Sequence, residues 1–208
     1  MVRQLRAISM VLAVAGLSAS GALAQTSQPT PLTGIPTVPK TLPVIGGGLF
    51  PSQNLNVATA SAIDRPDYVN YLISTGDSPD ETDKDGRTGL IYAAMSNYAD
   101  IVQTLISHAA KLDMRDKFGY TALHWAAERG NVVVMKLLLG AKAVVDPQNA
   151  QGITPLMLAT SSGNMPAVRL LLQNRADPHK QDYTGRDAFG WAGNHTAIVA
   201  LLNDATSH

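Results

Sequence analysis

Hydrophobic residues between positions 121 and 139 recur at the spacing of two short amphipathic helices. Thr121 can cap the first helix and Gly130 can end it, after which Asn131 can cap the second. The apolar faces consist of Leu123, Ala126 and Ala127 in the first helix and of Val134, Met135, Leu138 and Leu139 in the second. Neither helix is long enough to be stable alone in water, so the pair needs neighbours of the same shape.

The same pattern recurs along the chain at a period of 33 residues. Steps of 33 from Thr121 reach Thr88, Thr154 and Asp187, which are all cap-forming residues. Other rows are equally regular: Leu90, Leu123, Leu156 and Phe189; Ala93, Ala126, Ala159 and Ala192; Gly86, Gly119, Gly152 and Gly185; Asp83, Asp116, Asn149 and Asp182. A fixed period with so many matched positions indicates an array of repeats.

Two segments carry a recognisable motif: Gly152-Ile-Thr-Pro-Leu-Met-Leu-Ala159 and Gly119-Tyr-Thr-Ala-Leu-His-Trp-Ala126. They resemble the Gly-x-Thr-Pro-Leu-His-x-Ala motif of the ankyrin repeat, and the resemblance extends over about residues 53–204. It implies an all-α solenoid of about five helix-turn-helix repeats, joined by β-hairpins and closed by degenerate end repeats. The expected domain is 53–208, with repeats at about 53–84, 85–117, 118–150, 151–183 and 184–208.

One position departs from the family pattern. Ankyrin repeats usually place glycine after the second helix, where the chain turns with positive φ. Gly76 fits, but the later equivalents are Ala109, Lys142 and Arg175. A left-handed conformation would cost each of these about 1 kcal/mol. Either the turns differ from those of the family or the array tolerates strain there.

Residues 1–52 differ in composition from the repeats. Residues 1–24 have a basic start at Arg3 and Arg6, an apolar middle and the small-residue site Ala22-Leu-Ala24, which together predict a cleaved secretory signal peptide. The alternative is an uncleaved anchor, but the apolar run is shorter than the ~20 residues of a span. We therefore expect a periplasmic protein with no stable membrane span after cleavage. Residues 25–52 are rich in proline and glycine and predict a linker, acting as a spacer, a proline-rich ligand or an undocked tail.

Candidate chemistry is sparse. The formal net charge is zero without a basic tract, which argues against nucleic acid, and the chain has no cysteine. We find no zinc-protease helix, nucleophile elbow or calcium loop motif, and we expect no enzyme, cofactor or metal. His124 and Glu128 are too few to hold zinc, and the resemblance implies that His124 bonds the backbone of a neighbouring loop. The acidic turn 80–85 is interpreted as a solvated loop, with weak calcium capture as an alternative.

Binding residues are expected where partners of ankyrin proteins dock, on the hairpin tips and the exposed edge of the first helices. The candidates are Arg87, Met95, Lys117, Phe118, Tyr120, Glu128, Arg129, Ile153, Tyr183 and Arg186. We place Phe118, Tyr120 and Arg129 at the centre, because exposed aromatics beside basic residues are typical of binding hot spots. The alternative is scattered surface apolar residues. We expect Tyr92, Trp125 and Trp191 to pack the inner helix layer, with part of each ring on the concave face.

These expectations favour a monomeric, exported, non-catalytic module that binds a protein partner through its tips and concave helix face. Stress protection of another periplasmic protein is one version of this hypothesis, and an immunity-type inhibitor of a secreted toxin is another. An enzyme or small-molecule binder would need a clustered acid, base or nucleophile, and the sequence offers no such cluster.

Overall fold

The computed structural model describes residues 56–207. The predicted signal peptide (1–24), the linker (25–52) and the first residues of the expected first repeat lie outside the described residues. Among those described, none of the helices has the length and apolar character needed to cross a membrane.

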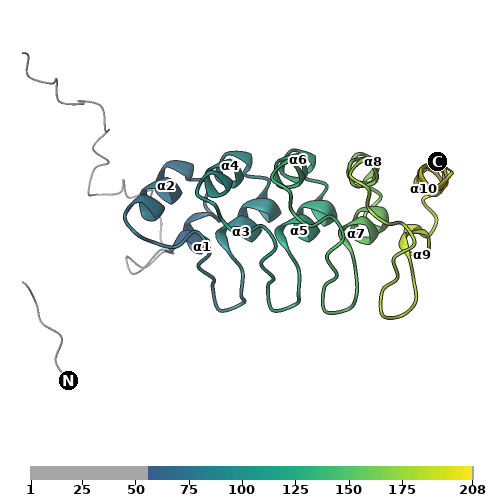
Figure 1. Cartoon of the computed structure of the whole chain (residues 1–208), viewed down its shortest axis with the longest axis horizontal. Helices are drawn as coiled ribbons and strands as arrows, with labels where there is room; N and C mark the ends of the chain where they lie inside the picture. Colours follow the sequence, from purple (N-terminus) through teal and green to yellow (C-terminus); the bar gives the residue numbers. More distant parts are fainter. Residues whose placement is uncertain (1–55, 208) are drawn as a thin grey trace, which may run out of the picture. The chain divides into compact units, whose positions relative to one another are not determined.

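The described residues form ten α-helices arranged as five pairs. First helices and second helices make two separate rows, and the loops between pairs project on the side of the first helices (Figure 1). The pairs are α1 Val57–Ala60 and α2 Pro66–Ser74, α3 Gly89–Ser96 and α4 Ala99–Ser107, α5 Ala122–Arg129 and α6 Val132–Gly140, α7 Pro155–Ser161 and α8 Met165–Gln173, and α9 Ala188–Ala192 and α10 Thr196–Thr206. The predicted all-α repeat solenoid is confirmed.

The connections are turns rather than β-hairpins with strands. Between residues 56 and 207 the only β pairing is an isolated bridge that joins Thr82 and Thr88. Each projecting loop is closed at its tip by one i to i+4 backbone bond, such as Asp116 N–H to Tyr120 O at 2.9 Å. The two arms then part toward different helices, so no ladder extends from the tip.

Capping residues fix most helix starts. The hydroxyls of Thr88 and Thr154 accept backbone N–H groups of the first turn at 3.3 Å, and the Asp187 carboxylate does the same at 3.0 Å. The prediction that Asn131 caps α6 is wrong, because its side chain makes no bond to its own helix. Its Nδ2 instead donates to the carbonyl of Ala94 at 2.8 Å, which satisfies an orphan group at the end of α3.

The core lies between the two rows and continues from one pair to the next. Leu90, Leu123 and Leu156 are at most 1% exposed, as the period-33 pattern predicts. The alanine row that includes Ala126 and Ala159 is fully buried, and these small side chains let neighbouring first helices approach closely. The second helices contribute large apolar side chains to the core, including Ile101, Val134, Met135, Leu138, Val168 and Ile198.

The turns after α4, α6 and α8 have a residue with positive φ, although this residue is not glycine. The φ angles are 57° at Ala109, 72° at Lys142 and 66° at Arg175. In each case the next residue is a buried alanine whose N–H bonds back into the helix, as Ala143 N–H does to Leu138 O at 3.0 Å. That bond requires a left-handed residue before it, so the array accepts the local strain.

Aspartates at period 33 link successive pairs. Carboxylate oxygens of Asp80, Asp113 and Asp146 each accept the backbone N–H of a residue 31 positions later, at 2.8, 3.0 and 3.0 Å respectively. Asp83, farther along the acidic turn 80–85, has an Oδ1 that accepts two backbone N–H groups within its own loop. The turn is partly exposed, and two of its carboxylates, those of Asp80 and Asp83, also hold backbone groups of the fold.

Candidate protein-binding surface

The projecting loops end in four tips of the same construction, at residues 83–87, 116–120, 149–153 and 182–186. In the second tip, Oδ1 of Asp116 accepts the N–H groups of Phe118 and Tyr120, both at 2.9 Å. Asp83, Asn149 and Asp182 hold the other tips in the same way. One side-chain oxygen therefore fixes the conformation of each tip.

Backbone bonds also join each tip to the next. Lys117 N–H donates to Asp85 O at 2.9 Å, Ala150 N–H to Phe118 O at 3.1 Å, and Tyr183 N–H to Gln151 O at 3.0 Å. The tips approach so closely that a Cβ on Gly119 would lie 2.7 Å from the Ala150 nitrogen. The tips consequently form one continuous edge whose spacing is set by the main chain.

Aromatic side chains tie three tips to the first helices. Tyr92 O–H donates to Asp83 Oδ2 at 2.7 Å, Trp125 Nε1–H to Asp116 Oδ2 at 3.1 Å, and Trp191 Nε1–H to Asp182 Oδ2 at 2.8 Å. We call this contact the aromatic–aspartate latch. The rings are half-buried, in agreement with the prediction that they pack the inner layer while part of each ring stays exposed.

The fourth helix pair lacks the latch, because both the aspartate and the aromatic residue are replaced. Asn149 stands in the aspartate row and Leu158 in the aromatic row, and Nδ2 of Asn149 is buried without a hydrogen-bond partner. The latch is visible in the sequence as a pairing: an aspartate and an aromatic residue nine positions later occur together in three repeats, and both are replaced in the fourth. The aspartate row was visible in the period-33 pattern, but its role depends on these contacts with the first helices.

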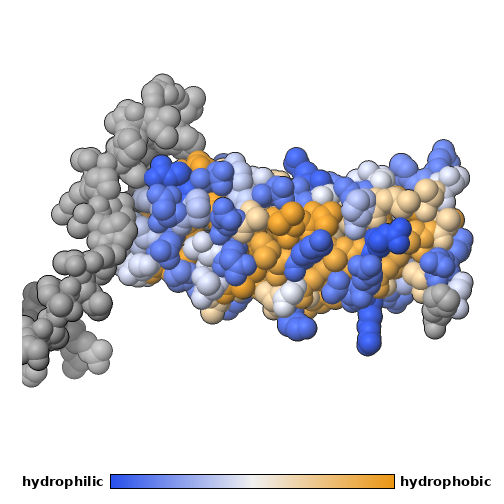
Figure 2. Space-filling model, turned by 90° about the horizontal axis from the view of Figure 1, so that it is seen from above, coloured by the Kyte–Doolittle hydropathy of each residue, from blue (hydrophilic) through white to orange (hydrophobic). Residues whose placement is uncertain are grey.

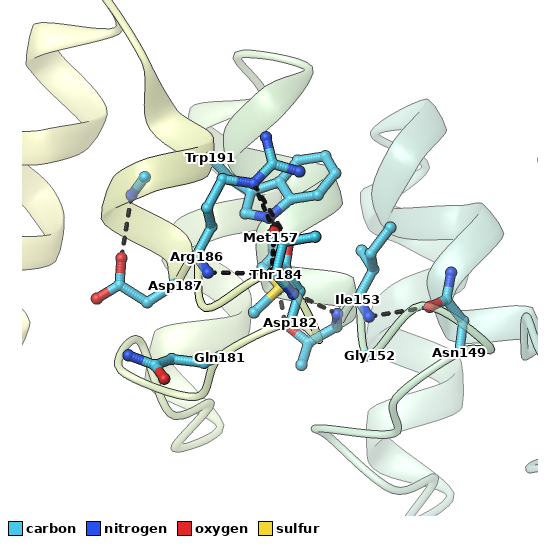
Figure 3. Close-up of polar contacts among 12 residues, drawn as sticks. Asn149, Gly152, Ile153, Met157, Gln181, Asp182, Thr184, Arg186, Asp187 and Trp191 are labelled. Carbon is cyan, nitrogen blue, oxygen red and sulfur yellow. Dashed lines mark hydrogen bonds and ion pairs between the residues drawn. The ribbon is translucent and has the colours of Figure 1, made fainter.

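The last tip shows the latch with a cation added (Figure 3). The Arg186 guanidinium lies 4.5 Å from the Trp191 ring centroid, and its Nε is 3.4 Å from Asp182 Oδ2. The hydrogen bond from the Thr184 hydroxyl, followed by those from Arg186 N–H and Trp191, holds the pKa of the Asp182 carboxyl well below its usual range. Asp182 therefore stays charged and keeps this tip closed.

A cation–aromatic cluster connects the second and third pairs. The Arg87 guanidinium lies 5.9 Å from the Tyr92 ring centroid and 5.6 Å from that of Trp125, between the two rings. The Tyr120 ring lies 5.1 Å from Trp125 and 5.4 Å from His124. Tyr120 is thus half-buried, and the expectation that it is an exposed aromatic is wrong, because it packs back onto α5.

Lys117 and Phe118 form the outer part of the second tip. Lys117 Nζ lies 2.6 Å from Asp85 Oδ1 and 5.0 Å from the Phe118 ring centroid. The hydrogen bond from Lys117 lowers the pKa of the Asp85 carboxyl. Because the two residues belong to neighbouring tips, their ion pair bridges those tips. Phe118 itself is 45% exposed, as predicted.

The remaining candidates are spread more widely. Tyr183 is 73% exposed on the last tip, and Met95 and Ile153 are half-buried. Glu128 and Arg129 are exposed at the C-terminal end of α5, whereas the tip with Phe118 precedes its N-terminal end. The structure therefore brings together Arg87, Lys117, Phe118 and Tyr120 through neighbouring tips, and it leaves Arg129 at the other end of the helix.

His124 is a structural residue. It is 0% exposed, its Nε2 lies 3.0 Å from Ile153 O in the next tip, and its Nδ1 accepts Thr121 N–H at 3.1 Å. Burial lowers its pKa to about 4, so the ring is neutral near pH 7. Both nitrogens are occupied, and the described residues contain no group of three or more side chains suited to a metal.

Stacked helix pairs with a rigid edge of tips define a helical repeat protein, a class whose elongated surfaces serve for binding. A family model described as ankyrin repeats (three copies) matches residues 55–149 and 134–207. The chain belongs to the ankyrin repeat family, whose members generally mediate protein–protein interaction and are typically non-catalytic. A comparison with curated proteins found no match.

Proposed function

We propose that this chain is an exported protein that binds a protein partner along its edge of tips and catalyses no reaction. The observation that carries the proposal is the pair of exposed aromatics on that edge, Phe118 and Tyr183. Exposed aromatic side chains on a rigid support are typical of the anchors that dominate binding energy.

The scaffold does not require these aromatics. At the position of Phe118 the other tips carry Asp85, Gln151 and Thr184. At the position of Tyr183 the other tips carry Lys84, Lys117 and Ala150. Polar or small side chains thus support the same tip conformation, and the two rings are additions that a binding role explains.

Preorganisation also supports the proposal. The aspartate side chain, the tip-to-tip backbone bonds and the latch fix each tip before any partner arrives. Binding then costs little ordering of the main chain, which raises affinity for a given contact area. Arg87, which lies against the Tyr92 and Trp125 rings, adds a positioned cation on the neighbouring tip.

The test compares chains whose tips are exchanged rather than truncated. Phe118→Gln and Tyr183→Ala place at each site the residue of the fourth-pair tip, 149–153, so the fold should be retained. We expect the double variant to recover a partner from periplasmic extract with at least about tenfold lower yield than wild type. The control is Gln151→Ala, an exposed tip position between the two rings, which should retain the yield. Equal recovery by the double variant and wild type, with unchanged thermal melts, would show that the tips are not the binding edge.

Export is proposed from the sequence of residues 1–24. N-terminal sequencing of the protein recovered from the periplasm should begin at Gln25, and intact Met1 in washed membranes would contradict cleavage. The recovered partner also distinguishes the two versions of the role. A secreted toxin would favour an immunity function, and a periplasmic protective enzyme would favour stress defence.

A further inference from the structure

A second surface, remote from the tips, carries an apolar groove between α6 and α8. The groove has a volume of about 430 Å³ and is lined by Val132, Met165, Pro166 and Leu170, with Lys136 and Arg169 among them. Viewed from the side of the second helices, hydrophobic surface gathers over the middle and C-terminal part of the row, while the α2 and α4 end is largely hydrophilic (Figure 2). Val133, beside the groove, is 56% exposed.

The preceding pair shows that the fold does not need this apolar surface. The residues of α4 at the positions of Val132, Val133, Lys136 and Leu137 are Ala99, Asp100, Gln103 and Thr104. Helix α4 has the same length as α6 and packs in the same row, although three of these four positions carry the polar residues Asp100, Gln103 and Thr104. Leu137 is half-buried and packs against the core cluster, so it is not part of the groove lining.

The charges of the groove indicate what would fill it. Its lining includes two cations, Lys136 and Arg169, and no acidic residue. Both side chains are exposed, and neither forms an ion pair within residues 56–207. An occupant that complements the groove therefore needs apolar side chains toward its floor and carboxylates beside the two cations.

We propose that the α6–α8 groove binds an amphipathic helix of a protein partner, with an apolar face flanked by acidic residues. Helices α6 and α8 have nine residues each, a length of about 13 Å, which matches two to three turns of a docked helix. The linker 25–52 contains no aspartate or glutamate, so it does not supply the complementary charge. This surface shares no residue with the proposed edge of tips, and either proposal can fail without the other.

The experiment titrates model helical peptides into the ¹⁵N-labelled full chain and follows amide shifts. The first peptide has about 14 residues, with leucines along one face and glutamates on both flanks. The second replaces its glutamates with lysines, and the third replaces its leucines with serines. We expect saturable shifts confined to α6 and α8 for the first peptide, with at least about tenfold weaker binding of the other two. Raising salt from about 0.05 to 0.5 M should weaken the first peptide several-fold, because its ion pairs are screened.

Variants of the chain make the assignment specific. Pro166→Asp with Leu170→Thr changes two lining residues to those that α4 carries at the same repeat positions, Asp100 and Thr104, so it should keep the wild-type melt while weakening the first peptide at least about tenfold. A charge reversal, Lys136→Glu with Arg169→Glu, leaves the apolar floor intact and should transfer the preference to the lysine peptide. The reversal also provides the test if the first variant does not fold.

Four results would overturn the proposal. The first is the absence of shifts on α6 and α8 with the leucine–glutamate peptide, and the second is equal binding of the glutamate and lysine peptides. The third is preferential binding of a synthetic 25–52 peptide, which would assign the groove to the chain's own segment. The fourth is a concentration-dependent dimer in sedimentation that the Pro166→Asp/Leu170→Thr chain loses, which would assign the groove to a second copy.

Discussion

Protonation of His124 should set the stability of the array between pH 7 and pH 4. Nε2–H of this buried ring donates to Ile153 O, and Nδ1 already accepts Thr121 N–H. A second proton must go on Nδ1, where it would face that donor in a site closed to water. The folded state therefore resists protonation, and the pKa falls to about 4 from an ordinary 6.5.

The sign and size follow from proton linkage. Between pH 6.5 and pH 4 the unfolded chain binds a proton that the folded chain does not, so the free energy of unfolding falls as pH falls through this window. A difference of 2.5 pKa units corresponds to about 3 kcal/mol in total. Most of it, roughly 2–3 kcal/mol, is lost by pH 4.5, and above pH 7 the contribution is constant.

The matched control comes from the next repeat. Met157 occupies the position of His124, and its sulfur accepts Thr154 N–H at 3.3 Å. A His124→Met chain keeps a buried acceptor but cannot titrate there. Urea unfolding at pH 7.0, 5.5 and 4.5 should show wild type losing about 2 kcal/mol more than His124→Met. The titration of Asp146, whose pKa is raised by burial, is common to both chains and cancels. Equal losses in the two chains would refute the assignment of the pH dependence to His124.

Three further predictions concern the scaffold. Asp116→Asn should lower the free energy of unfolding by about 1–3 kcal/mol, because an amide N–H₂ would then face Trp125 Nε1–H. Adding Trp125→Leu gives this pair the Asn and Leu of the fourth pair and should recover part of that loss. A strictly additive double-mutant cycle would disprove the latch. Lys142→Gly should stabilise by about 0.5–1 kcal/mol in urea melts, since φ is 72° there, and a loss would mean that the turn is not strained. Gly140→Ala, in α6 with open space around its Cβ position, should raise stability by about 0.5 kcal/mol in the same melts; a decrease would contradict the helical assignment.

The period-33 pattern was sufficient to predict the all-α array and its buried leucine and alanine rows. Helix pairs of this kind are specified locally, since each cap and apolar face is readable within one repeat. The errors arose where a side chain acts on a neighbouring repeat. Asn131 looked like a cap for its own helix, but it bonds the carbonyl of Ala94 in α3. Asp80, in the acidic turn, likewise holds the N–H of Lys111 in the next repeat, a contact that the period alone does not show.

The candidate surface was predicted in part. Phe118 and Tyr183 are exposed on the tips, where the resemblance to the ankyrin repeat placed them. Tyr120 was misplaced because its ring folds back onto Trp125, a contact that depends on rotamers rather than on spacing. The outer groove was missed because its apolar residues, such as Val132 and Leu170, stand in runs with core residues, and periodicity alone does not separate a core position from one at the edge of the core.

The two proposed surfaces lie on opposite rows of one scaffold, and this arrangement has a consequence for how partners would combine. The tips follow the first helices, while the groove lies on the second helices of the third and fourth pairs (Figure 1). In a repeat array each pair contacts only its neighbours, so a ligand on one face changes little on the other unless it shifts a pair. No residue of the α6–α8 groove takes part in the latch or in the tip-to-tip bonds. If both surfaces are used, one chain can hold a protein at its tips and an acidic helix at its outer groove at the same time, which is the property of an adaptor rather than of a simple blocker.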